Sequence, residues 1–549
     1  MDFTIALLGA SFLLSLVALL VFIASLSKGL LRTSKRDAEV IFGDDEVGLA
    51  EDPAAGAGAG RLQASIESAS GAMPHAAMSD ELLLERREID RSSVRVVWLA
   101  LTLAMFWLVF GSFAGLTSAL KMHWPDWLTQ WAALGFGRLR PLHLNVINYG
   151  WASLAGVGIA FWMLPRLLRT PLRGEYFAIA GVLLWSFGVF CGAVALLAGY
   201  SAGLEWLEFP FPIPLLLVIA GGLMAVPLLK TLAARKVHHL YVSVWYMGAA
   251  LFWFPVLYLV ANVPGVHFGV QQAAMNWWFG HNVLGLWFTP LGLAAAYYFI
   301  PKVLGRPIYS YNLSLLGFWT LAFFYSQVGG HHLIGGPLPS WLITLSIVQS
   351  VMMAVPVITV AINQHMTVVG RFDALRHSPT LRFVVLGAML YTLTSLQGSM
   401  EALRSINAVT HFTHYTVAHA HLGMYGFFTM IMFGAIYFVM PRVTEYEWPY
   451  PRLITAHFWL SSIGIGIYFV SLTIGGWLQG KAMLDAERPF MDSVLLTIPY
   501  LYGRSIGGTL MTLGHLIFAV HFSIVALRLG PKRVGAVQLA EREALANAQ

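Results

Sequence analysis

Histidines inside long apolar segments are the residues of this sequence most suited to chemistry. An imidazole is costly in lipid unless it is paired or bound to a ligand. The surrounding segments hold almost no Asp or Glu, whereas a transporter or channel would more often show intramembrane carboxylates. Metal or haem ligation is therefore indicated, and the clustered residues are His143, His281, His331, His332, His419 and His421.

The pair His419 and His421 is expected to serve two different cofactors. A separation of two residues on a helix means about 200° of rotation, so the two rings project from opposite sides. They cannot easily share one metal, but each can bind a cofactor on its own side. The alternative is two core histidines that hydrogen bond to their neighbours.

The adjacent residues His331 and His332 would normally diverge. The preceding Gly329 and Gly330 allow the backbone to leave ideal helix geometry, so that both rings can converge. Together with His281 they offer three nitrogens, which suit a copper ion with an open position. The alternatives are a wet loop for the adjacent pair and a structural core residue for His281.

All six histidines are predicted to lie at one level, in the outer half of a bilayer. His143 and His421 could then close the two axial positions of one haem. His419 could hold a second haem from one side and leave the other face free toward the copper.

The composition places these histidines in a membrane protein. Of the 549 residues, 58% are hydrophobic and only 11% are charged, whereas a soluble domain carries about 25% charged residues. This excludes a cytosolic enzyme, a nucleic-acid module and a disordered protein, so the net charge of +6 does not indicate a nucleic-acid partner. The single Cys191 excludes a disulfide framework and a Cys-based metal or haem site.

Apolar segments of about 20 residues predict an all-α, polytopic membrane protein. The first segment covers residues 3–25 and is read as a retained anchor rather than a cleaved signal peptide. Twelve further spans are expected near 94–118, 143–167, 176–200, 212–232, 239–263, 272–300, 309–330, 340–365, 380–400, 413–441, 453–477 and 506–529.

The chain is expected to have four parts. Residues 1–36 form the anchor, and residues 37–92 form a flexible cytoplasmic linker with an acidic run and an Ala/Gly/Ser-rich stretch. Residues 93–530 form a twelve-helix domain, and residues 531–549 form a C-terminal tail. Lys and Arg concentrate in the loops that carry Arg166, Lys230 and Arg442, so this side and the C-terminus are predicted to be cytoplasmic and the N-terminus periplasmic.

These histidines and spans resemble the haem–copper oxidase superfamily, and specifically the catalytic subunit of cbb3-type cytochrome c oxidases. The resemblance covers about residues 94–530 and implies a twelve-helix haem–copper oxidase core, here with one extra N-terminal transmembrane helix. It implies that low-spin haem b, high-spin haem b3 and the copper CuB are ligated, respectively, by His143 and His421, by His419, and by His281, His331 and His332.

Tyr325 matches the cross-linked active-site tyrosine of the cbb3 subfamily. It precedes His332 by seven residues, two turns on the same face, and the resemblance implies that it donates an electron and a proton to O–O cleavage. The alternative family is nitric oxide reductase, which replaces copper with non-haem iron and carries a Glu near the sixth-helix His. Here Asn282, Leu284 and Gly285 follow His281 without a carboxylate, so oxygen reduction is favoured.

Protons are expected to enter from the cytoplasm along the seventh core helix. Tyr311 and Ser314 lie within about 40° of the face of Tyr325 and resemble the K-type path of this family, although Tyr311 could equally be an interfacial residue. Gln397 stands where cbb3 enzymes have a Glu, which puts proton pumping in doubt, and Glu401 is a weak substitute. His239, near a cytoplasmic helix end, is read as solvated.

An outer loop matches the family's pattern for binding calcium and haem propionates. The resemblance implies Glu205 at the calcium ion and Glu208 at the propionates. Arg140 and Arg404 are at the correct level to pair with propionates, because the guanidinium fork suits carboxylates. Each of these residues has a solvated loop charge as its alternative reading.

The resemblance implies a terminal respiratory oxidase of the bacterial inner membrane that reduces O2 to water with electrons from cytochrome c and takes up protons. The chain has no c-haem or dicopper electron-entry motif, so partner subunits with c-type haems are expected. A non-enzymatic transporter in membrane lipid is the third reading, and it would require that the six histidines do not converge.

Overall fold

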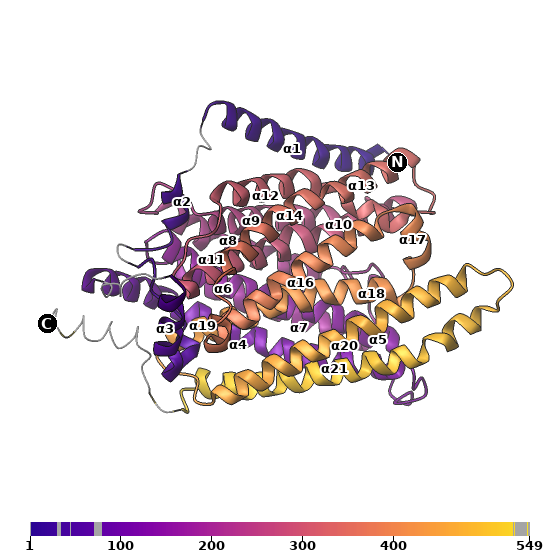
Figure 1. Ribbon diagram of the computed structural model, residues 1–549. Coiled ribbons are helices and arrows are strands. Elements are labelled where there is room, and N and C mark those ends of the chain that lie inside the picture. Colours follow the sequence, from indigo (N-terminus) through magenta and orange to yellow (C-terminus); the bar gives the residue numbers. More distant parts are fainter. Residues whose placement is uncertain are drawn as a thin grey trace.

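The computed structural model describes residues 2–29, 34–43, 46–70 and 79–530, together with 532 and 546. Within these ranges the protein is a bundle of helices without a strand (Figure 1). The short helices α2 and α3 lie at the same end of the bundle as the C-terminus. Most of the predicted C-terminal tail at 531–549 lies outside the described residues.

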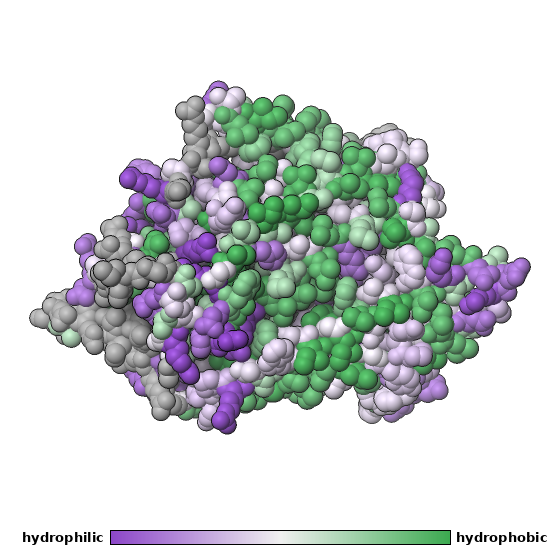
Figure 2. All heavy atoms as spheres, in the orientation of Figure 1, coloured by the Kyte–Doolittle hydropathy of each residue, from purple (hydrophilic) through white to green (hydrophobic). Residues whose placement is uncertain are grey.

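Eleven helical segments in the described residues are long and apolar enough to cross a membrane. Hydrophobic side chains cover the middle of the bundle and hydrophilic ones gather at its two ends (Figure 2). Six of these segments are single helices: α4 (Asp80–Lys121), α7 (Glu175–Ala198), α8 (Ile213–Ala233), α9 (Val242–Ala261), α16 (Pro379–Glu401) and α20 (Pro451–Met483). A seventh single helix, α21 (Phe490–Ala526), pairs with α20 along its length.

The other four segments consist of consecutive helical parts. They are α5–η3–α6 (Phe136–Asn145, Val146–Ala152, Ser153–Leu167), α10–η4–α11 (Val270–Val283, Leu284–Phe288, Thr289–Leu304), α13–α14 (Ser340–Met352, Ala354–Val368) and α18–η6–α19 (His414–His421, Leu422–Thr429, Met430–Thr444). The parts η3, η4 and η6 are π-helical turns. Such turns are rare and occur frequently at functional sites.

The span expected at 309–330 is divided into two parts. The α-helix α12 covers Tyr311–Phe324, and the 3₁₀-helix η5 covers Tyr325–Leu333. Gly329 lies against α10, where a Cβ atom would be only 2.2 Å from the carbonyl oxygen of Trp277. A side chain at this position would therefore keep η5 away from α10.

The N-terminal part differs from the flexible linker expected at 37–92. After α1 (Asp2–Ser27), α2 (Lys35–Glu39), η1 (Pro53–Gly58) and α3 (Ala59–Ser70) lie on the core, and α4 begins at Asp80, before the expected start at 94. Glu46, Glu51 and Asp52 are buried, because their carboxylates meet cationic or hydroxyl groups at the helix ends. The acidic run that suggested a solvated linker is thus a docking segment. The remaining short helices are η2 (Ala132–Leu134), α15 (Ala374–His377) and α17 (Arg404–Thr410).

Candidate functional site

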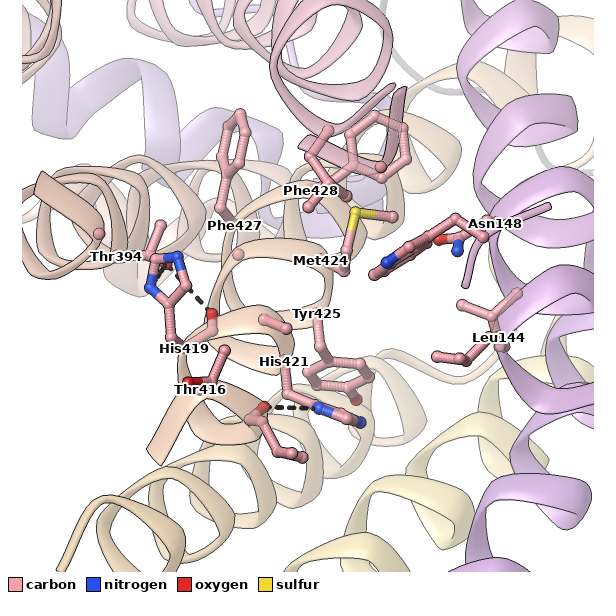
Figure 3. Close-up of a pocket in the computed structure, with 18 of the residues that line it drawn as sticks. Leu144, Asn148, Thr394, Thr416, His419, His421, Met424, Tyr425, Phe427 and Phe428 are labelled. Atoms are coloured by element: carbon pink, nitrogen blue, oxygen red, sulfur yellow. Dashed lines mark hydrogen bonds between the residues drawn. The ribbon is translucent and has the colours of Figure 1, made fainter. Parts of the chain in front are cut away.

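All six clustered histidines line one cavity of about 590 Å³ inside the bundle. They come from α5, α10, η5 and α18, which are far apart in the sequence. The walls between them are largely apolar and aromatic, including Met424, Phe427 and Phe428 (Figure 3). The cavity can therefore hold large, flat and mainly apolar groups between imidazoles.

His281, His331 and His332 form one three-nitrogen group. One nitrogen from each ring lies within 4.8 Å of the other two. His331 Nδ1 is 2.9 Å from Ser350 Oγ, and the indole of Trp277 stacks on His332 with ring centroids 4.1 Å apart. These contacts fix two of the rings, while the buried Nδ1 of His281 has no hydrogen-bond partner among the described residues. A convergent, partly unsatisfied set of neutral nitrogens fits a soft divalent or monovalent metal such as copper.

Tyr325 lies beside this group. Its ring centroid is 5.3 Å from that of His281, with an angle of 53° between the rings. The ring packs directly on Gly285, where a Cβ atom would lie 1.7 Å from Tyr325 Cζ. Gly285 therefore provides the space that the tyrosine ring occupies.

His143 and His421 face each other across another part of the cavity. Their rings are nearly parallel, at 12°, with centroids 6.2 Å apart. Nδ1 of His143 is 2.7 Å from the carbonyl oxygen of Gly111, and Nδ1 of His421 is 2.9 Å from that of Val417. An Nδ1–H held by a backbone carbonyl leaves Nε2 as the free lone pair, which is the arrangement of metal-ligating histidines.

His419 projects from α18 in a different direction from His421 (Figure 3). Its Nδ1 is 3.4 Å from Thr394 Oγ1 and 3.9 Å from Glu401 Oε1. Gly398 lies against this ring, since a Cβ atom there would be 2.8 Å from His419 Cε1. Two imidazoles of one helix thus serve two regions of the same cavity.

The predicted loop charges are divided between two places. Arg140 and Glu205 line the cavity and form an ion pair of 2.6 Å. Glu208 is buried beside Asn145 Nδ2, at 2.6 Å, and Arg404 donates to Thr344 Oγ1 at 3.2 Å. Neither Glu208 nor Arg404 is among the residues that line the cavity.

The two residues predicted on a proton path are both buried in α12. Tyr311 OH lies 2.9 Å from His239 Nε2 and donates to the carbonyl oxygen of Leu240, also at 2.9 Å. Ser314 Oγ donates to the carbonyl oxygen of Tyr311 at 2.6 Å. Buried tyrosines continue inward, where the rings of Tyr246 and Tyr297 stack with centroids 5.9 Å apart.

Sequence reasoning missed several residues of the cavity. Arg504 on α21 lines it, with its guanidinium carbon 5.7 Å from the ring centroid of Tyr468, whose hydroxyl lies 3.2 Å from His421 Nε2. The charge of Arg504 within a long apolar segment was the available signal. The π-helical turns that follow His143, His281 and His421 left no pattern in the residue types.

Comparison with known proteins shows the same architecture. Residues 95–510 match the family described as Cytochrome C and Quinol oxidase polypeptide I. The chain is 32% identical to the cbb3-type cytochrome c oxidase subunit CcoN1 of Stutzerimonas stutzeri, over 78% of this chain and 94% of that protein. It is 33% identical to cytochrome c oxidase subunit 1 of Rhodobacter capsulatus, over 75% of this chain and 82% of that protein.

Two more distant similarities support the fold. A nitric oxide reductase polypeptide of Stutzerimonas stutzeri is 25% identical over 71% of this chain and 86% of that protein. A chain of a solved heme–copper terminal oxidase dimer superposes with a TM-score of 0.68 at 17% identity, covering 81% of this chain and 86% of the other. The helical bundle is therefore shared beyond the range of close sequence similarity.

Proposed function

Because this chain belongs to the family of cytochrome c and quinol oxidase polypeptide I, and its relatives include cbb3-type cytochrome c oxidase subunits, we propose that it reduces O2 to water at a haem b3–CuB centre. It is a multi-pass membrane enzyme of the haem–copper oxidase group. The observation that carries the proposal is the convergence of His281, His331 and His332 in the cavity that His419 also lines.

The residues fit the cofactors that the family implies. His143 and His421 would hold the low-spin haem b through Nε2, and His419 would hold the high-spin haem b3. His281, His331 and His332 would hold CuB. When bound, these groups supply electron transfer and oxygen reduction, while the protein supplies position and electrostatics.

The chain's own residues account for the supply of protons and the charge around the cofactors. Tyr325 stands at the three-histidine group, where its hydroxyl can give a proton and its ring an electron. Tyr311 and Ser314 begin the path that would replace this proton from the cytoplasm. Arg140 and Arg504 are cationic side chains that line the cavity, and they would pair with the carboxylates of the haem propionates.

Electron donors and location follow from the same proposal. Partner subunits with c-type haems would pass electrons from cytochrome c to this chain. The basic ends of the helices, including Arg166 and Arg442, face the cytoplasm of a bacterial inner membrane, and the N-terminus lies on the periplasmic side. Glu205 at the outer end would share a calcium ion, in competition with its ion pair to Arg140.

The test replaces His281 with Ala in the purified oxidase complex. Oxygen uptake and bound copper should be lost, while the absorption spectrum of the low-spin haem stays, because His143 and His421 are untouched. His365→Ala is the matched control, since His365 bonds to Thr392 in a membrane segment but does not line the cavity. Unchanged oxygen uptake in the His281 variant would defeat the proposal.

A further inference from the structure

The part of the chain before residue 95 lies outside the family match, yet it covers the cytoplasmic end of the core. Helix α2 lies beside α12, the helix that carries Tyr311. The side chain of Asp37 on α2 is 20% exposed and that of His239 is 38% exposed, whereas Tyr311 is buried. These three side chains therefore run from the surface into the protein.

The contacts between them are continuous. Asp37 Oδ1 lies 3.5 Å from His239 Nδ1. The other nitrogen of the same ring, Nε2, lies 2.9 Å from Tyr311 OH. His239 thus has one nitrogen toward a surface carboxylate and the other toward the first buried hydroxyl of the path.

The N-terminal segment is held in this place by contacts on both sides of α2. Gly48 N–H donates to the carbonyl oxygen of Gly305 at 2.6 Å, and the backbone there is so close that a side chain on Gly305 would collide with Leu49. Glu46 binds Lys302 at 2.5 Å. The ring of Phe22 on α1 stacks on Trp319 of α12, with centroids 5.3 Å apart. The position of Asp37 is therefore fixed by the fold of the whole segment.

We propose that the N-terminal segment forms the entrance of the proton path, with Asp37 as its proton-collecting group. The carboxylate of Asp37 takes a proton from water and passes it to Nδ1 of His239. Nε2 then releases its proton to the oxygen of Tyr311, whose own proton moves inward, so each group ends with the number of protons it had at the start. This inference rests on the proposed function, because it requires that Tyr311 lies on the path in use.

The experiment measures proton uptake by the purified oxidase complex during oxygen reduction, with a pH-sensitive dye. Asp37→Asn keeps the side-chain oxygen that accepts the Ser34 N–H bond, seen at 2.5 Å, but cannot carry a proton. Uptake should slow about tenfold, less than the loss of a fully enclosed acid–base group, because His239 stays open to water. Asp37→Glu should restore it, and Glu39→Gln, an exposed carboxylate on the same helix, should leave it unchanged.

Two further variants separate the outcomes. Wild-type uptake in Asp37→Asn, or equal slowing in Glu39→Gln, overturns the entrance, and slow uptake in Tyr311→Phe would then leave the proposed path standing. Wild-type uptake in Tyr311→Phe would instead defeat the path itself. If Asp37→Asn does not assemble, His239→Gln breaks the same relay from the core side, and normal uptake there overturns the inference. The low-spin haem spectrum should be unchanged in every variant.

Discussion

The imidazoles of the cavity are prepared for ligation by groups that have no metal chemistry of their own. The carbonyl oxygens of Gly111 and Val417 hold Nδ1 of His143 and His421, and Ser350 holds Nδ1 of His331. Fixing one nitrogen leaves the other free in a defined direction, and such outer contacts commonly change metal affinity about 10- to 100-fold. A Ser350→Ala variant should therefore bind copper more weakly, by about that factor, measured by chelator competition, whereas unchanged affinity would show that Ser350 does not orient His331.

A small residue also determines the position of the catalytic tyrosine. In a Gly285→Ala variant the new methyl group would overlap the ring of Tyr325, so the ring must shift by more than an ångström. Oxygen reduction should fall by about 100-fold, while the low-spin haem spectrum is retained. Gly248→Ala is the control, because no atom lies within 4 Å of the added Cβ. Equal activity of the two variants would contradict the placement of Tyr325.

Glu208 should make stability depend on pH. Burial raises the pKa of Glu208 to about 7, against the hydrogen bond from Asn145, which favours the charged form. A carboxyl group with a raised pKa in the folded state contributes stability at low pH, and this contribution is lost as the pH rises through about 7. The thermal midpoint of the wild type should fall from pH 6 to pH 8 more than that of Glu208→Gln. Parallel pH profiles would contradict a buried, protonated Glu208.

Residue types predicted the chemistry of the site better than the positions of its loop charges. The six histidines lie on helices whose depth in the membrane follows from hydropathy, and the structure brings them to one cavity. Glu208 and Arg404 lie in or beside irregular segments, whose direction is set by local hydrogen bonds to Asn145 and Thr344. Periodicity carries no information on such segments.

At the scale of elements, the N-terminal segment neutralises the cytoplasmic ends of three core helices. Glu46 meets Lys302 and Arg86, and Glu51 meets Arg442, while Arg166 binds Asp90 at 2.6 Å. Although burial opposes the charged form, attraction by Lys302 and Arg86 keeps the pKa of Glu46 below its usual range, and Arg442 and Lys302 do the same for Glu51. This ionic contribution to stability is present above the usual carboxyl pKa and is lost as the pH falls below it.

Removing one member of this cluster should be costly. Lys302→Met would leave two buried carboxylates without one of their cations, which typically destabilises by about 3–5 kcal/mol. Arg376→Ala removes an exposed ion pair with Asp373 and should cost about 0–1 kcal/mol. Urea unfolding of both variants in detergent measures the difference, and similar unfolding midpoints would contradict the role of the cluster.

The elements show where prediction from sequence stops. Hydropathy located the membrane segments, but not the π-helical turns after His143, His281 and His421 or the 3₁₀ conformation of Tyr325–Leu333. These departures add or remove a fraction of a residue per turn, which the types of residues do not record. The acidic run near Glu46 suggested a solvated linker because its partners are distant in the sequence, and Lys302 follows it by 256 residues.

The whole molecule is a helical bundle whose apolar middle lies between two polar ends, with one cavity shared by residues from distant helices. Its shape follows from the family, and its N-terminal segment is an addition that closes the cytoplasmic end. The distribution of Lys and Arg predicts that a reporter fused after residue 530 is active in the cytoplasm and inactive in the periplasm. The opposite result would reverse the direction of the proposed proton path.

The proposed enzyme depends on imidazoles from distant helices that together hold two haems and one copper ion. Metal and haem analysis of the purified oxidase complex, with its covalently bound c-type haems counted separately, tests this arrangement most directly. We expect about one copper for two haems b, and in the His281→Ala variant we expect copper to be lost while the low-spin haem b is retained. Additional non-haem iron in place of copper would indicate nitric oxide reduction on the same scaffold, and a complex without haem b would contradict the proposed function.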